Sequence, residues 1–227
     1  MKTTNALRQG QNWVLHDYLQ VNGGAERLVA TLASGLPGYA LGVSGVYPAF
    51  LASGDYPDLR PQVMGPAWLQ ALSRVPRALA TFGWGCTRLQ TADSVVYSGI
   101  YAPLAVSRQA GGRKVLYCHT PPRFAFDWMP AYLHRIPAVF RPLLETAILQ
   151  YREAYLQAIR QMDTVVTNSR HVKSRLYLQT GIEAQVIYPP IDIARFQWQG
   201  QGDHYISLAR LEPNKRVDRI VRAFLSM

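Results

Sequence analysis

The stretch 163-DTVVTNSRHVKSRLYLQTGIEAQVIYPP-190 indicates which class of fold this chain adopts. Residues 163–167 form a short β-rich run of the kind found in buried strands. Ser169 is a good helix N-cap, and Gly181 is a good C-terminal stop for the helix that follows. A second strand is predicted at residues 185–188. Strand, helix and strand in this order are typical of a parallel α/β sheet.

The same alternation extends toward the N-terminus. Further strands are predicted at residues 13–16, 94–97 and 114–118, with weaker candidates at 39–46 and 61–64. Helices are predicted at residues 28–36, at 67–89 with an interruption near Gly83 and Gly85, and over most of 130–162. The pattern therefore predicts one parallel α/β domain over residues 1–190.

A second pattern of strand and helix lies at the C-terminal end, in 205-YISLARLEPNKRVDRIVRAF-224. The polar, turn-rich residues 191–203 before it predict a linker. A short apolar strand is expected to end at Arg210, and a turn then leads through Lys215 into an amphipathic helix. Two long cations beside a helix N-terminus are a common means of binding a diphosphate. The competing interpretation is a solvated turn with scattered cations.

Composition limits the classes of partner. The 227 residues carry a formal net charge of +10 with a pI near 9.9, and 48% of them are hydrophobic. The chain can therefore bury a sizeable core, and its charge favours an anionic partner such as a nucleotide diphosphate, an anionic lipid surface or a nucleic acid. We find no nucleic-acid-binding motif, so nucleic acid is not predicted.

Targeting and metal signals are weak in this sequence. Cys86 and Cys118 form neither a disulfide framework nor a zinc-site spacing, so the sequence predicts a reducing cytoplasm and no metal. The polar N-terminus lacks the apolar core of a signal peptide, and glycines and a proline interrupt the apolar stretch 28–47.

Three groups of residues follow predicted strands, where open α/β sheets bind ligands. Gly23 and Gly24 precede the first helix, where free N–H groups attract an oxyanion, although an ordinary strand-to-helix turn explains them equally well. His119 can orient or exchange a proton with a sugar hydroxyl, or it is a structural histidine. Arg123 adds a cation to the same loop.

The third group is Asn168, Ser169 and Arg170, which open the helix after the strand at 163–167. Helix capping accounts for the first two residues. Arg170 is a candidate for the same cleft as His119.

Four segments in this order resemble the family 4 glycosyltransferases, which have the two-domain GT-B fold. The segments are NGGAERL (22–28), YCHTPPRFAFD (117–127), DTVVTNSRHVKSRL with VIYPPID (163–192), and ISLARLEPNKRVDRIVRAF (206–224). The chain looks most like members that move mannose or a related sugar in surface-polysaccharide assembly. The resemblance implies a Rossmann-like acceptor-side domain at 1–190, a linker at 191–203, and the first strand and helix of a second Rossmann-like domain at 204–227.

The resemblance also implies roles for individual residues. Gly23 and Gly24 would lie near the donor phosphates and the acceptor, and His119 would face the transferred sugar. Arg210 and Lys215 would bind the donor diphosphate. Transfer would proceed with retention at the anomeric carbon, from GDP-mannose or a UDP-sugar to a glycan or lipid-linked acceptor, without a further cofactor.

Family members continue beyond the point that corresponds to Met227. We therefore expect an incomplete donor domain and an inactive isolated chain. The alternative is a non-catalytic module that binds an acceptor or a partner. The segments 68–88 and 124–160 are rich in aromatic residues and arginine, which suits a cytoplasmic protein bound peripherally to the inner face of the plasma membrane. An ordinary long helix with a core face explains the second segment equally well.

Overall fold

The computed structural model describes residues 11–193, 196–209, 211 and 215–226. Its contacts divide the chain into two compact units, Met1–Pro190 and Ile191–Met227. The first unit contains the sheet and most of the helices, and the second contains one helix among its described residues. Each unit is described below by itself.

The first unit is built on one parallel sheet of seven strands among the described residues, in the order β3-β2-β1-β4-β5-β6-β7. The strands are β1 (Asn12–His16), β2 (Tyr39–Val43), β3 (Gln62–Val63), β4 (Ser94–Ser98), β5 (Arg113–Cys118), β6 (Thr164–Thr167) and β7 (Gln185–Val186). Each of them corresponds to a predicted strand. The Rossmann-like α/β fold expected from the sequence is therefore confirmed.

The strand order reverses between β1 and β4. The chain proceeds from β1 to β2 and β3 on one side, and then crosses to β4 on the other side of β1. Open α/β sheets bind ligands at such a switch point, beside the carboxyl ends of the strands. The topology therefore places the sequence positions after β1 and β4 at the centre of the candidate site.

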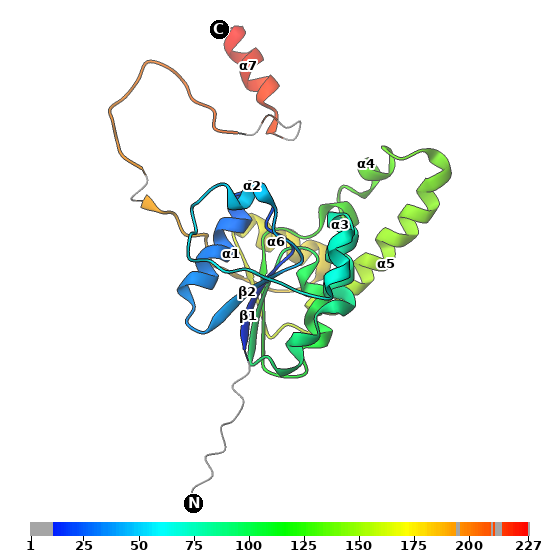
Figure 1. Ribbon diagram of the computed structural model, residues 1–227. Coiled ribbons are helices and arrows are strands. Elements are labelled where there is room, and N and C mark those ends of the chain that lie inside the picture. The colour runs from blue at the N-terminus through cyan, green and yellow to red at the C-terminus, as the bar shows by residue number, and fades with distance from the viewer. Residues whose placement is uncertain (1–10, 194–195, 210, 212–214, 227) are drawn as a thin grey trace, which may run out of the picture. The chain divides into compact units, whose positions relative to one another are not determined.

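Helices cover both faces of the sheet, with α1 and α2 on one face and α3 and α5 on the other (Figure 1). The α-helices of this unit are α1 (Gly24–Gly35), α2 (Pro48–Leu51), α3 (Arg74–Ala80), α4 (Met129–Leu133), α5 (Arg141–Ile159) and α6 (Arg170–Thr180). The shorter helical turns are η1 (Ala67–Ala71), η2 (Thr81–Gly85), η3 (Thr87–Thr91), η4 (Ala102–Arg108), η5 (Arg123–Ala125) and η6 (Ala138–Phe140). The apolar side chains of the strands are buried between these two layers.

The helical segment predicted at 67–89 is more broken than expected. It consists of the 3₁₀ turn η1, the short helix α3, the π-helical turn η2 and the 3₁₀ turn η3. Gly83 and Gly85 lie within η2, where the missing side chains weaken the preference for α-helical geometry. The turn η4 was not predicted, because residues 102–108 show no helical hydrophobic period.

In the second unit the predicted helix is present and the predicted strand is absent. The helix α7 spans Val217–Leu225, whereas residues 205–209 have no regular secondary structure. The ring centroids of Tyr205 and Phe224 lie 4.9 Å apart. A helix forms its hydrogen bonds within one segment, but a strand needs a neighbouring strand, and none pairs with 205–209 in the described part of the chain. Arg210 lies outside the described residues.

Candidate functional site

Polar side chains gather at the carboxyl edge of the central strands. His16 ends β1 and Asp17 follows it, Ser98 ends β4, and His119 follows β5. These strands are neighbours in the sheet and run in the same direction, so their carboxyl ends lie at one edge. This cluster occupies the switch point of the sheet, and we define it as the edge cluster.

Two histidines of the edge cluster share one serine hydroxyl. Ser98 Oγ lies 2.8 Å from His119 Nε2 and 3.2 Å from His16 Nδ1. The two imidazole rings meet edge to face, with their centroids 6.0 Å apart. Burial lowers the pKa of His16 to about 3 and that of His119 to about 4, and the nearby His119 contributes to the shift of His16. Both rings are therefore neutral near pH 7.

The shared hydroxyl links the tautomers of the two histidines. With these two partners the hydroxyl donates its proton to one ring, and the other ring donates to the hydroxyl oxygen. When Ser98 donates to His119 Nε2, the proton of neutral His119 is on Nδ1. Within the described part of the chain, Nδ1 of His119 makes no hydrogen bond. His119 is half-buried, and this nitrogen is suited to a ligand hydroxyl.

Asp17 is the most strongly bonded side chain of the edge cluster. Its carboxylate accepts hydrogen bonds from the backbone N–H groups of Ile100, Tyr101 and Ala102, each 2.8 Å long. Burial raises the pKa of Asp17 to about 6, although the three N–H donors act in the opposite direction. The carboxylate therefore joins the end of β1 to the loop after β4.

Gly99 makes this contact sterically feasible. Its backbone has a φ of +103°, and an added Cβ would lie 2.5 Å from Asp17 Cγ and Oδ1. A side chain at this position would both strain the backbone and displace the carboxylate. The geometry at the switch point therefore depends on this glycine.

The Gly23–Gly24 turn lies at the N-terminus of α1, as predicted. Gly23 is the N-cap residue and makes no side-chain cap, and Gly24 is the first residue of the helix. Glu26, in the first turn, places Oε2 2.7 Å from the position of a Gly23 Cβ. A carboxylate there complements the helix dipole, so a phosphate group at this terminus would compete with Glu26.

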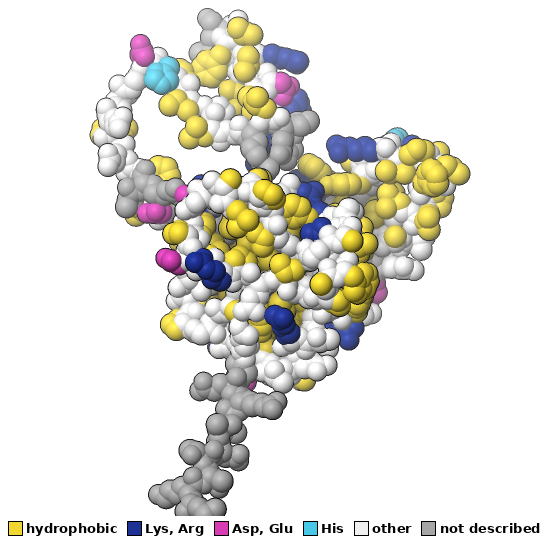
Figure 2. Space-filling view, viewed as in Figure 1, with side chains coloured by type: hydrophobic (Ala, Val, Ile, Leu, Met, Phe, Trp, Pro, Cys, Tyr) yellow, Lys and Arg dark blue, Asp and Glu magenta, His cyan; other side chains and the backbone are white. Residues whose placement is uncertain are grey.

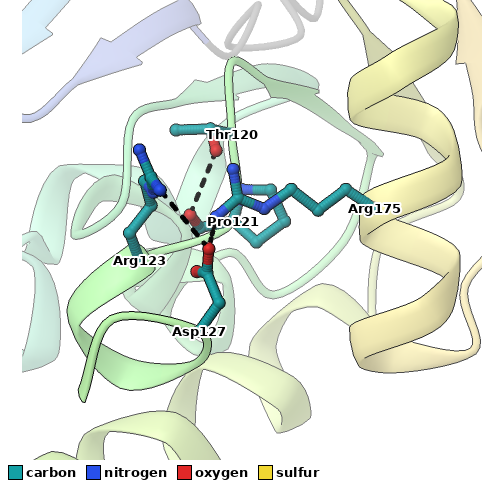
Figure 3. Close-up of polar contacts among 5 residues, drawn as sticks. All are labelled: Thr120, Pro121, Arg123, Asp127 and Arg175. Carbon is teal, nitrogen blue, oxygen red and sulfur yellow. Dashed lines mark hydrogen bonds and ion pairs between the residues drawn. The ribbon is translucent and has the colours of Figure 1, made fainter. Parts of the chain in front are cut away.

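Arg123 is held within its own loop (Figure 3). Its guanidinium lies 3.5 Å from Asp127 Oδ2 and 3.4 Å from the centroid of the Trp128 ring. Arg175 of α6 pairs with the same Asp127 oxygen. Partial burial acts to raise the pKa of Asp127, but the hydrogen bond and charge of Arg175, a backbone hydrogen bond and the charge of Arg123 together lower it. These contacts fix the loop after His119 against α6.

The three residues Asn168, Ser169 and Arg170 at the start of α6 have different surroundings. Asn168 Nδ2 donates to the backbone oxygen of His119 at 3.1 Å, which joins the ends of β5 and β6. Ser169 Oγ accepts from Val172 N at 3.2 Å and caps the helix, as predicted. Arg170 is exposed, and its side chain makes no ion pair among the described residues.

Lys215 belongs to the second unit, where it is exposed. The position of its expected partner Arg210 is outside the described residues. The joint role of these two cations in binding a diphosphate thus stays a prediction. Across the part of the chain that the structure describes, no three His, Cys, Asp or Glu side chains gather closely enough to hold a metal ion.

His16, Asp17 and Ser98 were not predicted as site residues from the sequence. The signal that selected His119 was a polar residue directly after a buried strand, and Asp17 stands in the same relation to β1. Applying that criterion to every predicted strand would have selected Asp17 and Ser98, but not His16, which is the last residue of its strand. What the sequence does not show is that these strands are neighbours.

The chain matches the model of a known protein family over most of its length. The family described as Glycosyltransferase Family 4 matches residues 22–195, which is more than half of the 227 residues. The match includes the Gly23–Gly24 turn, the His119 loop and the start of α6. No curated protein matches the chain.

Proposed function

This chain belongs to glycosyltransferase family 4, and from that membership we infer that it transfers a hexose, with mannose as the first candidate, from a nucleotide sugar to a glycan or lipid-linked acceptor. The observation that carries the proposal is the position of His119. It follows β5 beside the switch point, and its Nδ1 is unbonded within the described residues while Ser98 holds Nε2. In this proposal residues 1–190 form the acceptor side and residues 204–227 belong to the donor side.

His119 acts in this proposal as a positioning group for the transferred sugar. A neutral imidazole can donate to or accept from a sugar hydroxyl through Nδ1. The bond to Ser98 fixes the plane of the ring, and the bond from Asn168 to the His119 backbone fixes its loop. A ring that is held in this way needs little reorganisation when the sugar binds.

The chemical step that we propose proceeds with retention. The bond between the anomeric carbon and the diphosphate oxygen breaks, and a bond to the acceptor oxygen forms on the same face of the sugar. The acceptor proton passes to the leaving diphosphate. Arg210 and Lys215 neutralise the charge that develops on the diphosphate, with the N–H groups near Gly23 and Gly24 as further donors.

A transfer assay tests this function. The protein is incubated with GDP-mannose, and separately with a UDP-hexose, together with a lipid-linked acceptor fraction, and nucleotide release and glycosylated product are measured. The isolated 227-residue chain is expected to be inactive, so the comparison applies to conditions in which transfer is detected, and there we expect His119→Ala to lower the rate about 100-fold. The matched control is His134→Ala, since His134 is exposed at the end of α4. Equal rates for His119→Ala and the unaltered protein would contradict the role of His119.

The same assay separates the catalytic proposal from its alternative. Acceptor binding without transfer, with every donor tested, would support a non-catalytic binding module. Product formation with one donor would identify the nucleotide and the sugar together. Product analysis of the anomeric configuration would test retention.

A membrane contact forms part of the proposal. Val139, Phe140 and Leu143 are exposed at 78%, 59% and 73% on η6 and the start of α5. Figure 2 shows hydrophobic side chains gathered over α4 and α5, with Lys or Arg side chains beside them. Apolar groups flanked by arginines are suited to an anionic bilayer surface. No helix in the described part of the chain has the length and hydropathy needed to span a bilayer.

Vesicle co-sedimentation tests this contact. The protein is mixed with phosphatidylcholine vesicles with and without phosphatidylglycerol, at low and high salt. We expect binding that requires the anionic lipid and is lost in Leu143→Asp. The control Leu178→Asp makes the same change at an exposed leucine of α6. Binding that is unaffected by lipid charge and by salt would contradict the proposed contact, and with it the proposed location at the inner face of the plasma membrane.

A further inference from the structure

Two tryptophans lie side by side on the surface of the first unit, away from the edge cluster in sequence. Trp68 is in η1 and Trp84 is in η2, and their ring centroids are 5.6 Å apart with a tilt of 30°. Their exposed fractions are 60% and 44%. Exposing two adjacent indoles sacrifices the burial of large apolar side chains, so a site of this kind calls for a ligand.

A cavity of about 290 Å³ adjoins this pair. Trp84 lines it, and the buried side chains of Met64 and Cys86 also face it. Burial raises the pKa of Cys86 to about 12, so the thiol stays neutral and behaves as an apolar group. Thr87 and Arg88 add polar groups to the lining. The cavity thus combines apolar surface with a few hydrogen-bonding groups, as small-ligand sites do.

The backbone around the cavity has two unusual features. The turn η2 is a π-helix, a conformation that is rare and is often found at functional sites. Gly65 has a φ of +82°, and a Cβ added to Gly85 would lie 3.4 Å from Gly65 Cα. Two glycines therefore bring η2 close to the loop after β3 and set the shape of the cavity.

The cavity lies at the same edge of the sheet as the edge cluster. Met64 follows β3 directly, and its N–H donates to the carbonyl of Val43 at the end of β2. The parallel register places this loop at the carboxyl edge, two strands away from β1. A chain of sugar rings that starts near His119 could extend along this edge.

We propose that Trp68, Trp84 and the adjoining cavity form a subsite for a pyranose ring of the glycan acceptor. The proposal rests on the proposed transferase function for the identity of the ligand. The apolar C–H face of the ring packs on the indoles, and its hydroxyls bond to Thr87 and Arg88. One Arg88 nitrogen donates to Gln62 Oε1 at 3.1 Å, which orients the guanidinium and leaves further N–H groups for the sugar.

A bilayer surface is the other ligand that exposed tryptophans fit. Insertion into a bilayer requires an apolar protrusion, and a cavity lined by a threonine and an arginine does not contribute to it. The observations therefore favour the sugar ring, and vesicle binding becomes an outcome of the test.

Saturation-transfer NMR with simple sugars tests the subsite without any nucleotide sugar. The probes are the methyl pyranosides of mannose, glucose, galactose and rhamnose, with the unaltered protein and with Trp68→Ala/Trp84→Ala. We expect at least one pyranoside to bind and its affinity to fall about 10-fold or more in the double variant. The matched control is Trp198→Ala, since Trp198 is 85% exposed in the second unit. We expect this control to bind as the unaltered protein does.

A thermal unfolding scan establishes that the double variant folds, and Arg88→Gln gives a second test that leaves the indoles in place. We expect Arg88→Gln to lower the affinity for the pyranoside that binds best. Failure of every pyranoside to bind, or equal binding by the double variant and the unaltered protein, would overturn the subsite. So would loss of vesicle binding in the double variant without any loss of sugar binding.

These results are independent of the transfer assay. Sugar binding that needs the tryptophans, in a protein that transfers no hexose, would keep the subsite and reject the proposed function. Transfer with an unchanged acceptor KM in the double variant would keep the proposed function and reject the subsite.

Discussion

The segments 163–180 and 205–225 have the same sequence pattern, a short apolar run, a turn and a helix, but they fold differently. In the first segment both β6 and α6 form, and the side chains of Val165 and Val166 are buried. In the second segment α7 forms, residues 205–209 are not a strand, and Leu208 is 94% exposed. The helix depends on its own residues, whereas the strand depends on neighbours, which β6 has in β5 and β7.

The largest effect is expected from truncating one leucine beside the first segment, Leu116 of β5, which pairs with Val165 of β6, and one leucine within the second segment, Leu208. Leu116→Ala, in the fully buried centre of β5, should lower the free energy of unfolding by about 2–5 kcal/mol, because it removes core contacts and leaves a cavity. Leu208→Ala should change it by less than about 0.5 kcal/mol. Urea denaturation of both variants measures this, and equal losses would show that residues 205–209 are as well packed as β5.

The next effect concerns the contact between the loop after β4 and the end of β1. Gly99→Ala should destabilise the first unit by about 1–3 kcal/mol, because the new Cβ meets the Asp17 carboxylate in a strained backbone conformation. Gly35→Ala is the matched control, since no atom lies within 4 Å of its Cβ position and its φ is ordinary. Thermal unfolding that ranks Gly35→Ala below Gly99→Ala would contradict this account of the switch point.

The buried histidine predicts a dependence on pH. The pKa of His16 is about 3 in the folded protein, against an ordinary value of 6.5. Below pH 6.5 the unfolded chain binds a proton that the folded protein excludes, so stability falls as the pH falls from about 6.5 toward 3. The raised pKa of Asp17 acts in the opposite sense. The stability that comes from protonated Asp17 in the folded protein is lost as the pH rises from about 4 to 6.

The substitution His16→Asn isolates the His16 term, since the Asn Nδ2 group can still donate to Ser98 Oγ when Ser98 donates to His119. It should reduce the slope of unfolding free energy against pH by up to about 1.4 kcal/mol per pH unit between pH 4 and 6. Urea melts at several pH values measure the slope. An unchanged slope would mean that His16 is already protonated in the folded protein over this range.

The smallest effect concerns the starts of the two helices. Ser169→Ala removes the side-chain cap of α6 and should lower stability by about 1 kcal/mol. Arg216, at the N-cap of α7, has a φ of 50° and makes no side-chain cap. Arg216→Asn should therefore stabilise α7 by a few tenths of a kcal/mol, seen as slower amide exchange at 217–225. Faster exchange in this variant would indicate that Arg216 stabilises the helix, for instance through its contact with Asp218.

Most local features of the first unit were predictable from the sequence. Alternating apolar runs located the strands, Ser169 and Gly181 marked the ends of α6, and a polar residue after a buried strand selected His119. The failures have physical reasons. The strand at 205–209 was predicted from its apolar residues alone. The interruption of 67–89 near Gly83 and Gly85 was predicted and corresponds to η2, but the separate 3₁₀ turns η1 and η3 were not predicted.

The sequence by itself located the strands and most of the longer helices of the first unit, because periodicity and capping act over a few residues. Only the tertiary structure decided that His16, Ser98 and His119 meet, and that Asp17 binds the backbone N–H groups at 100–102, more than 80 residues away. The reason is the crossover that makes β4 a neighbour of β1. Polar residues at the ends of separate strands become one site only when the sheet order brings those ends together.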